Sequence, residues 1–155
     1  MPLVKRIAVS AGAAISMVVI IAITLPRVAH APRYRQEMWA VRAISTIHMA
    51  EMQYLEEYGR YASSLTQLGP GSGNANLIDS ELARGEGGGF KLVLNPTPVG
   101  YSVVVTPSRF RLAGSRTWFS DENMTIHQHS GQEPATVNDP LLGEAAAPHT
   151  QTPAK

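Results

Sequence analysis

Residues 32–58, PRYRQEMWAVRAISTIHMAEMQYLEEY, decide the fold of this chain. The segment contains no Gly, and its single Pro comes first, where proline suits the start of a helix. Its apolar residues recur at steps of three and four, the spacing of one helical face. This stripe consists of Ala40, Ala43, Ile44, Ile47, Ala50, Tyr54, Leu55 and Tyr58. The residues expected on the opposite, polar face are Arg42, Ser45, Glu51, Gln53 and Glu56. The pattern predicts a long amphipathic helix that ends at Gly59.

The chain beyond this helix changes from helical to alternating periodicity. Two short helical turns come first: Ser64 to Gln67 fits a capping box, and Asp79 is a suitable cap for residues 80–83. From Phe90 onward apolar residues alternate, which predicts strands over 90–94, 101–105, 116–119 and 124–127, with loops at 95–100 and 120–123. The long helix is the only element large enough to cover such a sheet. The expected fold class is therefore α+β, with the helix packed on three or four antiparallel strands.

An uncharged stretch precedes the helix, from Ile7 to Leu25: IAVSAGAAISMVVIIAITL. At about 1.5 Å per residue, these 19 residues nearly cover the ~30 Å hydrocarbon core of a bilayer. Residues 7–25 are therefore predicted to form a transmembrane helix, preceded by residues 1–6 as a short N-terminal tail, which the family resemblance described below places in the cytoplasm. Pro26 and Pro32 predict a kink or break after it.

A cleaved secretory signal is the competing interpretation of the same region. Ala29-His30-Ala31 has the small-x-small form of a cleavage site. Against it, the apolar run is longer than the usual signal core, and Pro32 would follow the cut. Basic residues lie on both sides of the run, so the positive-inside rule does not by itself decide the orientation.

Length and composition limit the remaining choices. The chain has 155 residues, enough for one domain with appendages. Its net charge of +1, with scattered Lys and Arg, does not favour nucleic-acid binding. Cysteine is absent, which excludes disulfides and thiolate chemistry. Residues 26–130 are expected to form the folded domain. Residues 131–155 are rich in Pro, Ala and Thr and are expected to be a disordered tail.

Two groups of residues are candidate metal sites. His127 and His129 lie on one side of a predicted strand and could supply two nitrogen ligands to a metal, but the sequence identifies no third ligand, which favours a solvated strand end. Residues 121–123, Asp-Glu-Asn, are rich in oxygen but lack the spacing of a calcium loop, which favours an ordinary turn.

Three other patterns give no site either. His48 is interpreted as a residue on the flank of the long helix. The glycines at 85, 87, 88 and 89 lack the Lys-Ser/Thr of a phosphate loop and predict a mobile connector. Ser, His and Asp residues occur without a nucleophile motif. We therefore expect no enzyme, no cofactor, and no catalytic or metal-binding residue.

The order of these parts resembles that of type IV pilins and type II secretion pseudopilins. The resemblance is carried by AVRAISTIHMAEMQYLEEYGRYASSLTQLG at 40–69, then LIDSELARG at 77–85, GFKLVL at 89–94, GYSVVVTP at 100–107 and RTWFSDENMTIH at 116–127. It does not extend to the leader, because residues 5–16, KRIAVSAGAAIS, contain neither the Gly-Phe pair nor the Glu of that family. The prepilin-peptidase site and the assembly Glu are therefore not carried over.

The resemblance implies a membrane-anchored structural or interaction component of a type IV pilus or type II secretion-like envelope system. It places the protein in a bacterial inner membrane as a single-pass protein, with its N-terminus in the cytoplasm and its main domain in the periplasm. The implied partners are membrane lipid and other pilin-like or secretion-system subunits, and the missing Glu leaves oligomerisation open. A cut after Ala31 would instead release a secreted or periplasmic binding module.

Overall fold

The structure, a computed structural model, describes residues 35–71, 73 and 75–144. A boundary at Arg35 divides the chain into two units, and the architecture below concerns the unit that starts at Gln36. The predicted cytoplasmic tail, transmembrane helix, proline break and Ala31 cleavage site lie outside the described residues, as do residues 145–155. Within the described ranges, no helix is long and apolar enough to cross a membrane.

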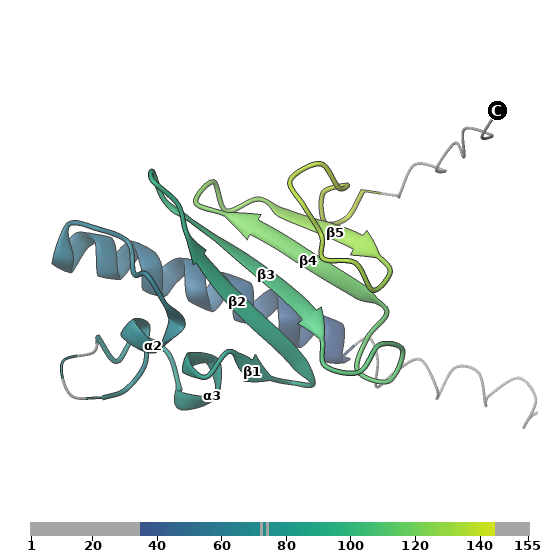
Figure 1. The fold of residues 1–155 in the computed structure, drawn as a ribbon, viewed down its shortest axis with the longest axis horizontal. Coiled ribbons are helices and arrows are strands. Elements are labelled where there is room, and N and C mark those ends of the chain that lie inside the picture. The colour runs from purple at the N-terminus through teal and green to yellow at the C-terminus, as the bar shows by residue number, and fades with distance from the viewer. Residues whose placement is uncertain (1–34, 72, 74, 145–155) are drawn as a thin grey trace, which may run out of the picture. The chain divides into compact units, whose positions relative to one another are not determined.

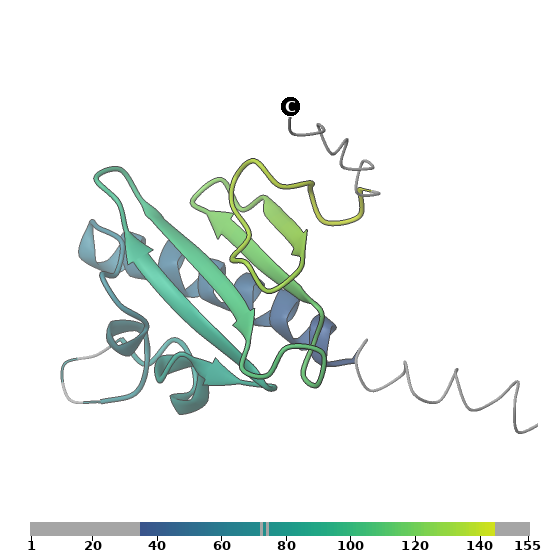
Figure 2. The same ribbon diagram turned by 45° about the vertical axis from the view of Figure 1, so that its right-hand side comes forward.

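The fold class is α+β, as predicted. A long helix, described over residues 35–58, runs across one face of an antiparallel sheet (Figures 1 and 2). Its strands are β1 (Glu86–Gly87), β2 (Phe90–Pro96), β3 (Tyr101–Pro107), β4 (Arg116–Asp121) and β5 (Ile126–Ser130). They pair in sequence order, so the sheet of the described region has five strands rather than three or four. The additional strand is β1.

The register of the sheet divides its side chains between two faces. Leu92, Val105 and Trp118 lie across from one another on neighbouring strands and are buried. They belong to the core formed with the helix, because alternate residues of a strand point to the same side. The opposite, outer side carries the row Val93, Val104, Phe119 and His127.

The helix contributes the predicted apolar stripe to this core. Two residues differ from the prediction: Glu51, expected on the polar face, is buried, and Tyr58 in the last turn is exposed. Ala40, Ile44 and Ile47 are completely buried. Tyr58 was expected in the stripe but is exposed, and it stacks on Tyr54 with 4.4 Å between ring centroids. Gly59 then adopts a φ of 69°, a left-handed conformation that ends the helix as predicted.

The passage from helix to sheet contains two one-turn helices, α2 (Leu65–Leu68) and α3 (Ser80–Ala83). Asp79 caps α3 as predicted, its carboxylate accepting hydrogen bonds from the backbone N–H groups of Glu81 and Leu82. The capping box at α2 is only partly formed, since Ser64 makes no side-chain capping bond while Gln67 accepts one from the Ser63 N–H.

The glycine-rich stretch 85–89 was predicted to be a mobile connector, and the structure corrects this prediction. Residues 86 and 87 form β1. The indole of Trp39 lies so close to Gly87 and Gly88 that an added Cβ would come within 2.4 Å of it at either position. The long helix therefore packs through Trp39 directly on the backbone of these glycines, and a side chain at either position would collide with the indole ring.

The C-terminal prediction also differs from the structure. A disordered tail was expected from residue 131, but residues 131–144 fold back along β5; we call this segment the strap. The backbone N–H of Gln128 donates to Pro140 O and that of Leu142 donates to Ile126 O. The strap buries little apolar surface apart from Ala135. Backbone pairing along the sheet edge holds it, which composition does not reveal.

Candidate functional site

A chain of hydrogen bonds lies buried between the long helix and the sheet. His48, on the helix, contacts Tyr101 of β3 through Nδ1 at 2.5 Å and Ser120 of β4 through Nε2 at 2.8 Å. The Ser120 hydroxyl donates its only proton to Thr125 O at 2.7 Å. Ser120 must therefore accept from His48 Nε2–H, which leaves Nδ1 to accept from the Tyr101 hydroxyl. The imidazole is thus fixed in one neutral tautomer.

The environment of His48 favours that neutral form. Burial lowers the pKa of His48 below its ordinary value, against an opposing effect of the Asp121 charge. Burial also raises the pKa of Tyr101, so its hydroxyl keeps the proton that it donates. The interpretation of His48 as a helix-flank residue is therefore wrong: only the sheet reveals that this position is enclosed.

Glu51 lies one turn further along the helix and was expected on the polar face. It is instead 0% exposed. Its Oε2 accepts a hydrogen bond from the Ala62 N–H at 2.8 Å, whereas Oε1 has no hydrogen-bond partner among the described residues. Burial raises the pKa of Glu51 to about 7, although the Ala62 bond lowers it. This carboxyl joins the helix to the loop that follows it and gains or loses a proton near neutrality.

These groups do not form a hydrolytic centre. A serine nucleophile needs a base that takes its proton, but the Ser120 proton is held by a backbone carbonyl. Tyr61 closes the cluster on one side, with its ring 5.1 Å from that of Tyr101. The bonds of His48 satisfy the buried hydroxyls of Tyr101 and Ser120 and fix the helix against β3 and β4.

His127 and His129, for which the sequence favoured a solvated strand end over a metal site, contact the strap. His127 Nδ1 donates to Asp139 O at 2.6 Å, and His129 Nδ1 contacts Asp139 Oδ1 at 2.8 Å. Asp139 also accepts from the Thr136 N–H and hydroxyl. Within the ranges that the structure describes, no group of three or more ligand side chains could hold a metal ion. The pair therefore serves to hold the strap against β5.

Asp121 to Asn123, considered as a calcium loop, joins β4 to β5. Asp121 Oδ1 accepts from the Asn123 N–H at 3.1 Å, and Asp121 O accepts from Met124 N. Met124 adopts a φ of 61°, which tightens the hairpin. Asp121 therefore uses a side-chain and a backbone oxygen within the turn itself, in keeping with the interpretation favoured by the sequence.

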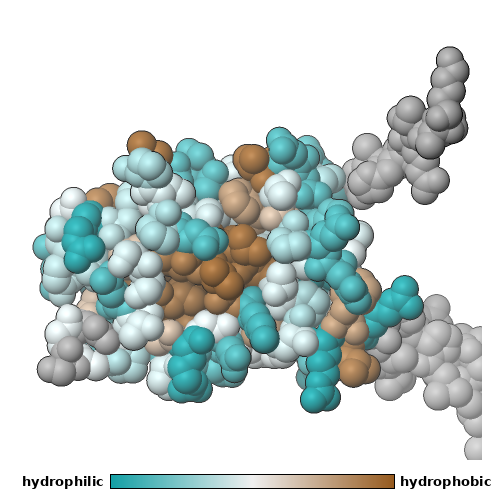
Figure 3. All heavy atoms as spheres, in the orientation of Figure 1, coloured by the Kyte–Doolittle hydropathy of each residue, from teal (hydrophilic) through white to brown (hydrophobic). Residues whose placement is uncertain are grey.

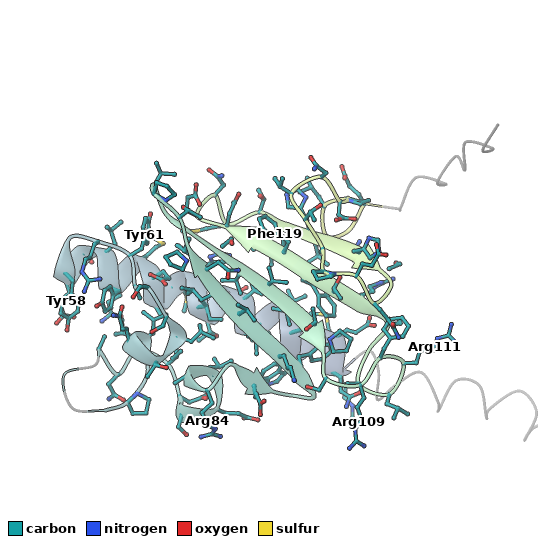
Figure 4. All side chains as sticks on the ribbon, in the orientation of Figure 1. Tyr58, Tyr61, Arg84, Arg109, Arg111 and Phe119 are labelled. Carbon is teal, nitrogen blue, oxygen red and sulfur yellow. The ribbon has the colours of Figure 1, made fainter. Side chains whose placement is uncertain are left out.

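The outer side of the sheet presents an apolar surface. Val93 is 53% exposed, and Val104 and Phe119, its neighbours across the strands, are partly exposed. Figure 3 shows the hydrophobic patch at the centre of this side, and Phe119 is labelled in Figure 4. We call Val93, Val104 and Phe119 the outer patch. The alternation of the strands could have identified Val93 and Val104 from the sequence, because each is an apolar residue at a position where the neighbouring outward-facing residues of β2 and β3 are polar.

The described part of the surface includes two hollows. One, of about 330 Å³, lies where Tyr61 and Ala62 face the β2–β3 loop around Val99. The other, of about 280 Å³, is lined by Gln36, Gly89, Ser108, Arg109, Leu112 and Ala113. Neither contains the buried network.

The chain matches no known family model, no curated protein and no solved structure.

Proposed function

We propose that this protein is a membrane-anchored, pilin-like structural or interaction component of a type IV pilus or type II secretion-like envelope system. The observation that carries the proposal is the order of parts along the chain. The apolar stretch 7–25 precedes a long helix, and that helix covers one side of an antiparallel sheet whose strands follow in sequence order. In such an arrangement the helix supports one side of the sheet and the other side can present surface to neighbours.

The outer patch supports an interaction role. The helix covers the inner side of the sheet and the strap is held at β5, whereas Val93, Val104 and Phe119 keep exposed surface that a partner could contact. Small clusters of exposed apolar side chains surrounded by polar residues are typical of protein interaction sites. Other pilin-like or secretion-system subunits would be the partners, with membrane lipid around residues 7–25.

Cell fractionation combined with protease protection tests the anchor and its orientation. The chain is expected in the inner membrane, resistant to alkaline extraction, with the domain after Gln36 digested only once the outer membrane is opened. Recovery of the full-length chain in the cytosol would rule out the proposal.

A second candidate is a secreted or periplasmic binding module, favoured by the sequence Ala29-His30-Ala31. Cleavage after Ala31 would give a soluble product that starts at Pro32. The intact mass of the protein purified from cells distinguishes the two, because an anchored protein retains residues 7–25 and the released module lacks them.

A further inference from the structure

The loop that joins β3 to β4, residues 108–115, lies where the chain enters the domain. The backbone N–H and the hydroxyl of Ser115 contact Glu37 Oε1 at 3.2 and 3.3 Å, and Arg116 lies 3.6 Å from Glu37 Oε2. Figures 1 and 2 both show this loop beside the N-terminal end of the long helix, which is drawn in blue. We call residues 108–115 the arginine loop.

Backbone hydrogen bonds fix the shape of the arginine loop. The Ser108 N–H donates to Gly89 O, and the Ala113 N–H donates to Arg109 O. Arg111 has a φ of 64°, in the left-handed region, and its N–H donates to Gly114 O at 2.6 Å. Ala113 and Gly114 are buried against the domain. The tip is therefore a preformed projection.

The exposed side chains of that tip combine positive charge with apolar surface. Leu112 is 69% exposed, between the exposed Arg111 and the buried Ala113. Arg109 and Arg111 are exposed, and neither forms an ion pair with any carboxylate in the described part of the chain. The Arg111 guanidinium lies 5.9 Å from the centre of the Phe110 ring. Figure 4 shows both arginines pointing outward at this end of the fold.

This combination matches a bilayer interface. Guanidinium groups bind lipid phosphates while their aliphatic stems and a neighbouring leucine remain in the apolar boundary. One exposed leucine is ordinary on a protein surface, but here it directly follows Arg111 on a loop fixed by backbone hydrogen bonds, and neither Arg111 nor Arg109 forms an ion pair with a described carboxylate. Arg27 and Arg33, which follow the apolar stretch in sequence, have the same charge.

The length of the chain restricts the distance between this loop and the bilayer. Ten residues lie between Leu25 and Gln36, so the eleven Cα-to-Cα steps from one to the other span at most about 40 Å when fully extended. If residues 7–25 are embedded, the tethered end of the domain is the end that carries the arginine loop. We propose that Arg109, Arg111 and Leu112 dock on the anionic headgroups of the same bilayer and hold the domain at its surface. This inference rests on the proposed membrane anchor.

The absence of cysteine allows a direct test with the full chain. Ser108→Cys carries an environment-sensitive fluorophore on the arginine loop, and Val99→Cys carries it on the β2–β3 loop, where Val99 is 79% exposed. Each labelled chain is reconstituted into vesicles of phosphatidylcholine or of an equal mixture with phosphatidylglycerol. Brominated lipids then quench any label at the bilayer surface, and vesicle flotation reports whether the chain is anchored.

The docking proposal predicts strong quenching at position 108, weak quenching at 99, and an increase at 108 when phosphatidylglycerol is present. Each arginine is expected to contribute roughly fivefold to the ratio of docked to free domain. Arg109→Ala with Arg111→Ala should therefore lower that ratio about 25-fold and remove its dependence on anionic lipid. The matched control, Arg84→Ala with Lys91→Ala, removes two exposed charges elsewhere and should leave quenching unchanged.

Two results would overturn the proposal, and they separate it from the anchor. If the chain does not float with vesicles of either composition, both the anchor and the docking are wrong. If the chain floats but positions 108 and 99 are quenched equally, or the double arginine variant behaves like its control, only the docking is wrong. Such a result would direct attention to a protein partner for the arginine loop.

Discussion

Both sides of the sheet have histidines bound to them or on them, and these histidines have different roles: His48 reaches the inner side from the long helix, whereas His127 and His129 belong to β5. On the inner side, His48 is enclosed, neutral, and bonded to Tyr101 and Ser120. On the outer side, His127 and His129 remain partly exposed and hold a strap through Asp139. Burial makes the inner bonds costly to lose, because an unpaired group there cannot turn to water. The outer bonds can be replaced by water, so the two sides should differ in their response to substitution.

The largest expected effect is at His48. His48→Ala removes a buried ring and leaves the Tyr101 hydroxyl and Ser120 Oγ each without one partner. The free energy of unfolding of the chain in detergent is expected to fall by roughly 2–4 kcal/mol. Denaturant unfolding monitored by tryptophan fluorescence measures the change. Ser45→Ala, on the exposed side of the same helix, serves as the control and should stay within about 0.5 kcal/mol.

Glu51 should make the inner side sensitive to pH. The pKa of its carboxyl is raised from 4.5 to about 7 in the folded state. Between these values the folded chain binds a proton that the unfolded chain has released, so stability should fall as pH rises, by up to roughly 3 kcal/mol. Glu51→Gln should abolish this slope and be more stable than wild type above pH 7.

Unfolding measured at a series of pH values tests this expectation. The exposed Glu56→Gln variant should keep the wild-type slope. A wild-type stability that is flat between the two pKa values would show that Glu51 is solvated rather than enclosed, and the contrast between the two sides of the sheet would weaken.

A smaller effect is expected at Asp139 on the outer side. Burial raises the pKa of Asp139, but bonds from His129 and Thr136 outweigh it, and the net pKa lies below its ordinary value. Its stabilising contribution is therefore present above the ordinary value and is lost as pH falls through the folded pKa. Asp139→Asn should cost about 1 kcal/mol at neutral pH.

Hydrogen exchange locates that effect. The amides of Gln128 and Leu142, which pair strap and β5, should lose protection in Asp139→Asn, while amides of the inner core do not. Glu133→Gln, a change at an exposed carboxyl in the same segment, should leave exchange unaltered. Uniform loss of protection across the domain would mean that the strap is part of the core.

The smallest effect on stability is expected at the outer patch. Val93→Lys places a charge on an exposed position and should change the free energy of unfolding by no more than about 0.5 kcal/mol. Cross-linking of the membrane-embedded protein to its neighbours should nevertheless decrease. A variant that loses stability but retains its cross-links would argue against the outer patch as an interaction surface.

The helix and four strands could be predicted because each shows a local signal. Helical spacing defined the stripe from Ala40 to Tyr54, alternation marked β2 and β3, and Gly59 and Asp79 supplied recognisable ends. The two features that the sequence did not predict, β1 and the ordered strap, depend on partners distant in sequence. β1 forms where glycines accept the ring of Trp39, and the strap orders where backbone groups meet the free edge of β5.

The candidate sites were harder to predict for the same reason. His127 and His129 were correctly placed on one side of a strand, but their partner, Asp139, lies in a segment whose composition indicated disorder. Glu51 and His48 lie on the buried face of the helix, next to apolar residues at helical spacing. Glu51 was assigned to the exposed face only because its side chain is polar, and this assignment was wrong.

The sequence by itself determined the α+β class, the order of elements and the uncharged stretch 7–25, because periodicity and hydrophobicity are local properties. Only the tertiary structure decided that His48 and Glu51 are enclosed, that Asp139 holds the strap, and that the arginine loop lies beside the entry of the chain into the domain. Those outcomes depend on which distant groups exclude water from one another, and that is fixed only when the helix packs on the sheet.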